Sequence, residues 1–174
     1  MEVSQPLVAI GIKDDNLDDE NIVKKHIAIE ILLNLIIGKS SNLYKELYES
    51  GIIMEEPDKS YEFSKNYAHI VISCQTKDEN IFIEKVKQEI EKIKINGIPE
   101  EDFERIKKKI YGEYVMEYNQ ISDISRMFLA DYFKGINSFD YIEEHKLVTR
   151  EFTEKILNDI FKEENMAQAV IKNS

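Results

Sequence analysis

The spacing of hydrophobic and polar residues changes several times along the chain, and each change marks a new predicted element. Residues 7–12 form a short run with β-branched side chains before the polar turn DDNLDDE, which predicts a buried strand. The most apolar stretch, 27–37, predicts a core helix that begins after a cap at Asp18 or Asp19, with acidic residues in its first turn. Gly38 is expected to end this helix.

The next stretch, GKSSNLYKELYESGII, carries the signals of a break and a second, short helix. Ser40 or Ser41 can cap a helix that runs from residue 42 to about residue 50, and Gly51 stops it. The serines and glycines of this stretch are therefore interpreted as helix ends.

Residues 52–76 change to the two-residue period of extended chain. Tyr61 and Phe63 alternate with polar residues, and positions 68, 70, 72 and 74 then share one face. These two stretches predict an antiparallel pair of strands.

Helical spacing returns after residue 80. One helix is expected over 80–96 with Gly97 as its cap, and Pro99 opens the next helix with three acidic residues in its first turn. Residues 121–145 predict a further helix, or a pair of helices broken near Gly135.

The C-terminal part completes the pattern. Thr149 is expected to cap a last helix that runs to residue 161, and residues 166–171 predict a closing strand. This order is typical of an α+β fold in two layers, with a mixed or antiparallel sheet and helices on one face. A length of 174 residues and an apolar fraction of 43% suffice for one core, so we expect a single α+β domain over residues 1–174.

The charge balance excludes some classes of partner. The chain has 23 lysine and arginine residues against 34 aspartate and glutamate residues, a net charge of -11. A surface this acidic repels phosphate backbones and anionic lipids, so we expect neither nucleic acid nor membrane as a partner. The longest apolar stretch is also too short to cross a bilayer.

Cys74 is the single cysteine of the chain, which excludes an intrachain disulfide and favours a reducing, cytoplasmic location. It alternates in phase with Ile70 and Ile72, so we interpret it as a small core residue. The first residues lack the basic region of a signal peptide. A strand that begins almost at the first residue suggests an excised piece of a longer protein.

The serines after Gly38 could belong to a phosphate-binding loop or include a nucleophilic serine, but the sequence favours neither. A phosphate-binding loop needs a further glycine upstream of the Gly-Lys-Ser sequence, and a nucleophilic serine needs a second glycine in G-x-S-x-G after a strand. Neither pattern is complete here.

The three histidines offer no complete metal site. His26 and Glu30 are one turn apart and could hold a metal, but with Asn34 they more simply form a polar stripe on an apolar helix. His69 lies on the strand face opposite Ile70, where a solvent or inter-helix position is expected.

The segment YIEEH, residues 141–145, is one substitution away from the zinc motif H-x-x-E-H. Tyr141 stands where the first histidine would be, so zinc would have one good ligand. We interpret this segment as an acidic surface helix. Taken alone, the residues indicate an acidic α+β domain with no catalytic constellation and no metal site.

The stretch after the core helix also resembles a segment of the insulinase-type (pitrilysin family) zinc peptidases. In that family a helix ends in a small-residue loop, and the next helix reads roughly L-Y-x-x-L-x-E-x-G-L. The residues that fit are Gly38, Ser40, Ser41, Leu43, Tyr44, Leu47, Glu49 and Gly51. KQEIEKIKINGIPEEDFERIKKKIYGEY and HKLVTREFTEKILNDIF followed by MAQAVI are similar to later segments of the family, so the resemblance spans nearly the whole chain.

The resemblance implies a metal-free C-terminal half of a bacterial zinc metalloendopeptidase. Peptidases of this family have two homologous halves that close around a peptide, and the N-terminal half carries H-x-x-E-H and the zinc. This chain has no such motif, so the resemblance implies that it is inactive alone, holds no cofactor itself, and has a zinc-bearing half and a peptide substrate as partners.

In many members this half supplies an arginine and a tyrosine in L-R-E-x-G-x-x-Y, which help to hold the scissile carbonyl. Tyr48 stands in place of the arginine and Met54 in place of the tyrosine. A cation at a developing oxyanion can contribute about 2.7–4 kcal/mol, so this departure is large. The chain then belongs either to a subgroup with different helper residues or to a non-catalytic partner subunit.

The expected substrate-binding residues are therefore Tyr44, Tyr48 and Met54, with no catalytic residue in the chain. The alternative functions are a structural or partner subunit of such a peptidase, a peptide-binding module, or an independent domain that shares only the fold.

Overall fold

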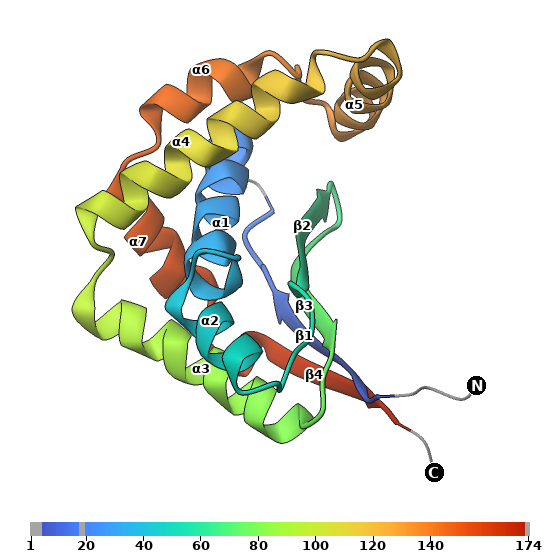
Figure 1. Ribbon diagram of the computed structural model, residues 1–174. Helices are drawn as coiled ribbons and strands as arrows, with labels where there is room; N and C mark the ends of the chain where they lie inside the picture. Colours follow the sequence, from blue (N-terminus) through green and yellow to red (C-terminus); the bar gives the residue numbers. More distant parts are fainter. Residues whose placement is uncertain (1–4, 18–19, 173–174) are drawn as a thin grey trace.

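The computed structural model describes residues 5–17 and 20–172. It has one four-stranded sheet in the order β2-β3-β1-β4, with every neighbouring pair antiparallel. The strands are β1 (Leu7–Lys13), β2 (Asp58–Ser64), β3 (Tyr67–Gln75) and β4 (Met166–Ile171). The helices gather on one face of this sheet (Figure 1). The predicted α+β class is thus confirmed, and the sheet is antiparallel rather than mixed.

The described part of the chain contains seven α-helices. They are α1 (Ile22–Ile37), α2 (Asn42–Glu49), α3 (Glu79–Asn96), α4 (Glu100–Glu117), α5 (Ile121–Lys134), α6 (Asp140–Leu147) and α7 (Arg150–Ile160). The stretch predicted as one helix or two is a pair, α5 and α6, and Gly135 ends α5 in the left-handed conformation.

The sheet buries the face that the alternating pattern predicts. Val8, Ile10 and Ile12 of β1 point into the core, and Ile10 lies opposite Ile72 of β3. Ala68, Ile70, Ile72 and Cys74 share the inner face of β3, and Tyr61 and Phe63 continue it on β2. The hydrophobic core lies between this face and the helices.

Helix α1 runs through the middle of the molecule and is buried on most of its circumference (Figure 1). A helix that is apolar almost all round needs neighbours on several sides, and α1 packs against the sheet and against α4, α6 and α7. The cap predicted at Asp18 or Asp19 lies outside the described residues. Asn21 occupies the N-cap position, and the prediction of acidic residues in the first turn is wrong.

The other helix ends follow the predicted signals. Thr149 Oγ1 accepts from the Phe152 N–H at the start of α7, and Gly97 ends α3 with a φ of 75°. No helix in the described ranges is both long and apolar enough to span a bilayer.

Candidate functional site

The joint between α1 and α2 is held rigidly by short-range hydrogen bonds. Gly38 ends α1, its carbonyl accepts from the Ser41 N–H at 2.8 Å, and Ser41 Oγ accepts from the Tyr44 N–H at 3.0 Å. Of the two serines considered as caps, Ser41 is the one that caps α2. Ser40 instead accepts a hydrogen bond from Arg105 of α4 at 2.7 Å.

The exit from α2 is fixed to the sheet. Gly51 turns the chain with a φ of 70°, and Ile53 then forms an isolated β-bridge with Thr76 just after β3. The Thr76 hydroxyl donates to the Ile52 carbonyl at 3.1 Å. Helix α2 is thus anchored at both ends, which fixes the position of its backbone relative to the sheet.

Two of the three predicted substrate-binding residues meet on helix α2. The rings of Tyr44 and Tyr48 are stacked, with centroids 5.7 Å apart and an interplanar angle of 21°. Tyr44 packs partly against the core, whereas Tyr48 is 52% exposed. Met54 lies beyond the turn at Gly51 and is 63% exposed, outside the stacked pair.

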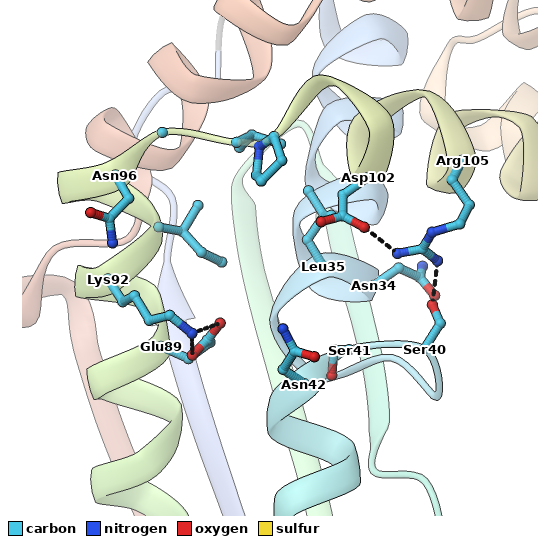
Figure 2. A pocket seen from close by; sticks show the side chains of 14 residues that line it. Asn34, Leu35, Ser40, Ser41, Asn42, Glu89, Lys92, Asn96, Asp102 and Arg105 are labelled. Atoms are coloured by element: carbon cyan, nitrogen blue, oxygen red, sulfur yellow. Dashed lines mark hydrogen bonds and ion pairs between the residues drawn. The ribbon is translucent and has the colours of Figure 1, made fainter.

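A pocket of about 200 Å³ lies beside the joint, between the end of α3, the start of α4 and the residues that connect α1 to α2. Figure 2 shows Arg105 reaching Ser40 and Asp102, and Lys92 paired with Glu89. The pocket is lined by Asn34, Leu35, Ser40, Ser41, Asn42, Glu89, Lys92, Ile93, Asn96, Gly97, Ile98, Pro99, Asp102 and Arg105. Because its charged side chains pair with one another, the pocket suits a small neutral polar group and offers no nucleophile with a base.

His26 and Glu30, the pair that could begin a metal site, are held by tyrosines. His26 Nδ1 lies 2.7 Å from the Tyr141 hydroxyl, and the Tyr114 hydroxyl donates to Glu30 Oε2. The other oxygen of Glu30 lies 3.5 Å from His26 Nε2. The polar stripe on α1 is confirmed, and its side chains face α4 and α6.

Burial also changes the ionisation of these two groups. Burial lowers the pKa of His26 to about 3, and nearby Lys134 adds to this shift. Burial raises the pKa of Glu30 to about 7, and Glu117 and Glu113 raise it further against the Tyr114 hydrogen bond. Since zinc takes three or four protein ligands, and no three His, Cys, Asp or Glu side chains converge within residues 5–17 and 20–172, these residues do not fit a zinc ion.

The segment YIEEH is more buried than its sequence predicted. It forms most of α6, but Tyr141 and His145 are buried, so the interpretation as a surface helix is wrong for this face. His145 Nε2 lies 2.8 Å from the Lys107 carbonyl, and burial lowers the pKa of His145. Periodicity shows which residues of a short helix share a face, but not that a polar face will be the covered one.

Sequence reasoning missed the most deeply buried charges in the described chain. Lys25 of α1 forms an ion pair with Asp14 at 2.6 Å, and both side chains are almost wholly buried. A signal was present: Asp14 alternates in phase with Ile10 and Ile12, and Lys25 lies on the same helical face as Ile29.

Cys74 is buried on the inner face of β3, as predicted. Burial raises the pKa of its thiol to about 12, with Glu55 and Asp58 adding to the shift. Its thiolate is therefore scarce at neutral pH, which makes it unreactive.

Comparison with known protein families gives a match over residues 1–110 to the model of the peptidase M16 inactive domain. Among curated proteins, the chain is 24% identical over 162 residues to the uncharacterized zinc protease YmfH of Bacillus subtilis (strain 168). That match covers 91% of this chain and 37% of the relative.

Solved structures share the fold over the whole chain. A protein from Alicyclobacillus acidocaldarius named an M16-like peptidase superposes with a TM-score of 0.93 at 23% identity, over 100% of this chain and 42% of that chain. A peptidase M16 inactive domain from Pseudomonas fluorescens superposes with a TM-score of 0.78 at 14% identity, over 100% of this chain and 42% of that one. The chain thus spans less than half the length of these relatives.

Proposed function

Because this chain belongs to the peptidase M16 inactive domain family, we propose that it is the metal-free C-terminal half of a bacterial, cytoplasmic zinc metalloendopeptidase. In this role it closes a peptide-degrading chamber over a zinc-bearing half and helps to bind an extended peptide substrate. Zinc in that companion half would activate the attacking water. Alone, this chain would be inactive.

The observation that carries the proposal is the stacked pair of Tyr44 and Tyr48 on the anchored helix α2. The pair lies at the segment through which relatives of this family help to hold the substrate. A rigid, exposed aromatic surface can bind apolar side chains of a peptide at little cost in conformational entropy. Met54 adds a flexible apolar side chain that can adapt to different residues.

Tyr48 can do only part of what the family's arginine does. An arginine carries a fixed charge and several donors toward an oxyanion, whereas a tyrosine hydroxyl is neutral and donates one hydrogen bond. We therefore assign Tyr48 and Met54 to substrate binding and not to stabilisation of the transition state. Closure of this half over the peptide would also exclude water from the site.

The test pairs two exposed tyrosines, Tyr48 on α2 and Tyr67 at the start of β3, which are 52% and 54% exposed. Peptide hydrolysis is measured with the zinc-bearing half present. Tyr48→Ala should raise KM about tenfold, worth about 1.4 kcal/mol, with kcat little changed, since uniform binding is lost. Tyr67→Ala should leave both constants within about twofold. If Tyr48→Ala and Tyr67→Ala changed KM equally, Tyr48 would have no specific role in substrate binding.

A structural partner subunit is the second candidate, and the replacement of both family helper residues by Tyr48 and Met54 favours it. The gene that encodes this chain distinguishes the two. An H-x-x-E-H motif upstream in the same reading frame supports the peptidase half, whereas one in a neighbouring gene fits a partner subunit. If the two chains bind each other but hydrolyse no peptide, this domain only builds the chamber.

A further inference from the structure

Helix α5 presents several large apolar side chains to solvent, whereas its buried residue is an aspartate. The exposed apolar residues recur at helical spacing, with exposed fractions from 58% for Leu129 to 83% for Ile121. Tyr132 and Phe133 extend the same face. Asp131, on the opposite side, is the buried residue of the helix, with 6% exposed. We call Ile121, Leu129, Tyr132 and Phe133 the outer face of α5.

Specific contacts fix this orientation. The Ser138 hydroxyl donates to Asp131 Oδ2 at 2.6 Å, which ties the inner side of α5 to the segment before α6. Phe128 meets the Phe139 ring edge to face at 5.2 Å. At the C-terminal end, Lys134 lies over the Phe63 ring of β2 at 4.5 Å. The helix therefore cannot rotate its outer face inward without losing these contacts.

The outer face is unusual for a water-exposed helix. Single apolar residues on a surface are common, but four on one helix face, two of them branched and two aromatic, are typical of an interaction site. Figure 1 shows α5 beyond the end of α4, at the edge of the helical layer. A partner can therefore reach the outer face without displacing any part of the core.

We infer that the outer face of α5 docks against the zinc-bearing companion half, an inference that rests on the proposed function. The occupant follows from the length of the relatives: the B. subtilis protein and the A. acidocaldarius structure each have more than half of their chain beyond the region matched here. In these relatives the additional chain is tethered to the matched region, which gives it a high effective concentration at the surface of that region.

The acidic residues near α5 indicate which charge a partner surface should carry. Three carboxylates, those of Glu117, Asp123 and Asp131, lie near one another where α4 leads into α5. Burial raises the pKa of Glu117, and the nearby Asp123 and Asp131 raise it further. Arg126, the exposed cation of the helix, is already paired with Asp123. The matching surface on the companion half is therefore apolar with a basic rim. A second copy of this chain fits poorly, because two copies with a charge of -11 each repel one another.

A labelling experiment locates the contact directly. The native Cys74 is buried and unreactive, so a single introduced cysteine reports its own surroundings. Leu129→Cys on α5 and the control Ile95→Cys, at an exposed apolar position of α3, are treated with a maleimide. This is done with and without the H-x-x-E-H-bearing polypeptide from the same gene or its neighbour. Docking should slow labelling of Leu129→Cys at least about tenfold and that of Ile95→Cys less than about twofold.

A second variant measures the contribution to affinity. Leu129→Gln with Phe133→Gln should weaken binding of the companion half at least about tenfold, and Ile95→Gln should leave it within about twofold. Both side chains are exposed, so far-UV circular dichroism should show the native helix content.

If the halves bind equally well with the double variant and Leu129→Cys is not protected, the inference is wrong while the proposed function stands. If the wild-type halves do not bind, the proposed function fails. If protection requires only this chain at high concentration, the occupant is a second copy and the inference is overturned.

Discussion

The ammonium group of Lys25 lies 2.6 Å from the Asp14 carboxylate, with both side chains almost wholly withdrawn from water. The Tyr61 hydroxyl donates to the same oxygen at 2.7 Å, and Lys25 also donates to the Asn16 carbonyl at 2.8 Å. One polar cluster therefore joins the end of β1, the start of α1 and the strand β2. A buried charge of this kind is tolerated only because its partners are all in place.

Removing one partner of this pair should destabilise the protein strongly. Lys25→Met leaves the Asp14 carboxylate buried without a cation, which should lower the free energy of unfolding by about 3–5 kcal/mol in urea titrations. Combining it with Asp14→Leu should recover most of the loss, since no uncompensated charge remains. A single-variant loss below about 1 kcal/mol would mean that water reaches the pair.

Glu30 should make stability depend on pH in a defined direction. Its pKa is about 7 in the folded protein and 4.5 ordinarily, so between these values the folded state holds a proton that the unfolded chain has lost. Ionisation therefore lowers stability as the pH rises. The unfolding free energy of wild type minus that of Glu30→Gln should fall by about 3 kcal/mol from pH 4.5 to 8.

His26 makes stability change with pH in the opposite direction. The comparison of wild type with Glu30→Gln is therefore needed to isolate the contribution of Glu30. The pKa of His26 is lowered from 6.5 to about 3, so stability is lost as the pH falls below 6.5 and the unfolded chain takes up the proton. The two trends oppose each other in wild type over the range they share. Glu49→Gln, at an exposed position of α2, is the control for the loss of a carboxylate outside the core. A flat difference for Glu30→Gln would show that burial does not shift the Glu30 pKa.

Two glycines should respond to alanine with opposite signs. A Cβ at Gly38 would lie 2.6 Å from the Asn34 carbonyl oxygen, so the end of α1 must shift, and Gly38→Ala should cost more than about 2 kcal/mol. Gly112 lies inside α4 with open space around it, and Gly112→Ala should stabilise by about 0.5–1 kcal/mol. Chemical denaturation of both variants provides the comparison. A neutral Gly38→Ala would show that the joint is loose.

The two serines of the joint provide a matched test of the helix cap. Ser41→Ala removes the acceptor for the Tyr44 N–H and should cost about 1 kcal/mol of stability. Ser40→Ala removes only an exposed contact with Arg105 and should cost less than about 0.5 kcal/mol. Equal losses would assign the cap to neither serine.

Most of the fold could be predicted because its signals are local. The alternation at β1 and β3, the glycines that end α1 and α3, and Thr149 before α7 each depend on neighbours in sequence. The family resemblance, which is confirmed, also depended on local signals, because the residues that carried it lie around helix ends. Capping and turn chemistry act over a few residues, so they are readable without the tertiary structure.

What sequence reasoning missed depends on which faces meet. The buried position of Tyr141 arises because α6 packs on α1 and offers His26 a partner. The outer face of α5 escaped notice because helical periodicity identifies an apolar side without showing whether anything covers it. The roles of Tyr44, Tyr48 and Met54 stay predictions, since the geometry fixes their positions but not what binds there.

The place of β1 in the sheet has a consequence for how the chain folds. Leu7 pairs with Gln75 on one side and with Ile171 on the other, so one edge of β1 stays unpaired until β4, more than 150 residues later, has been made. Closing so long a loop is entropically costly and slow. During translation, β1 and β3 can pair while the β1 edge stays open to other chains. Pairing of β4 therefore covers an edge of β1 through which the nascent chain could otherwise pair with another chain.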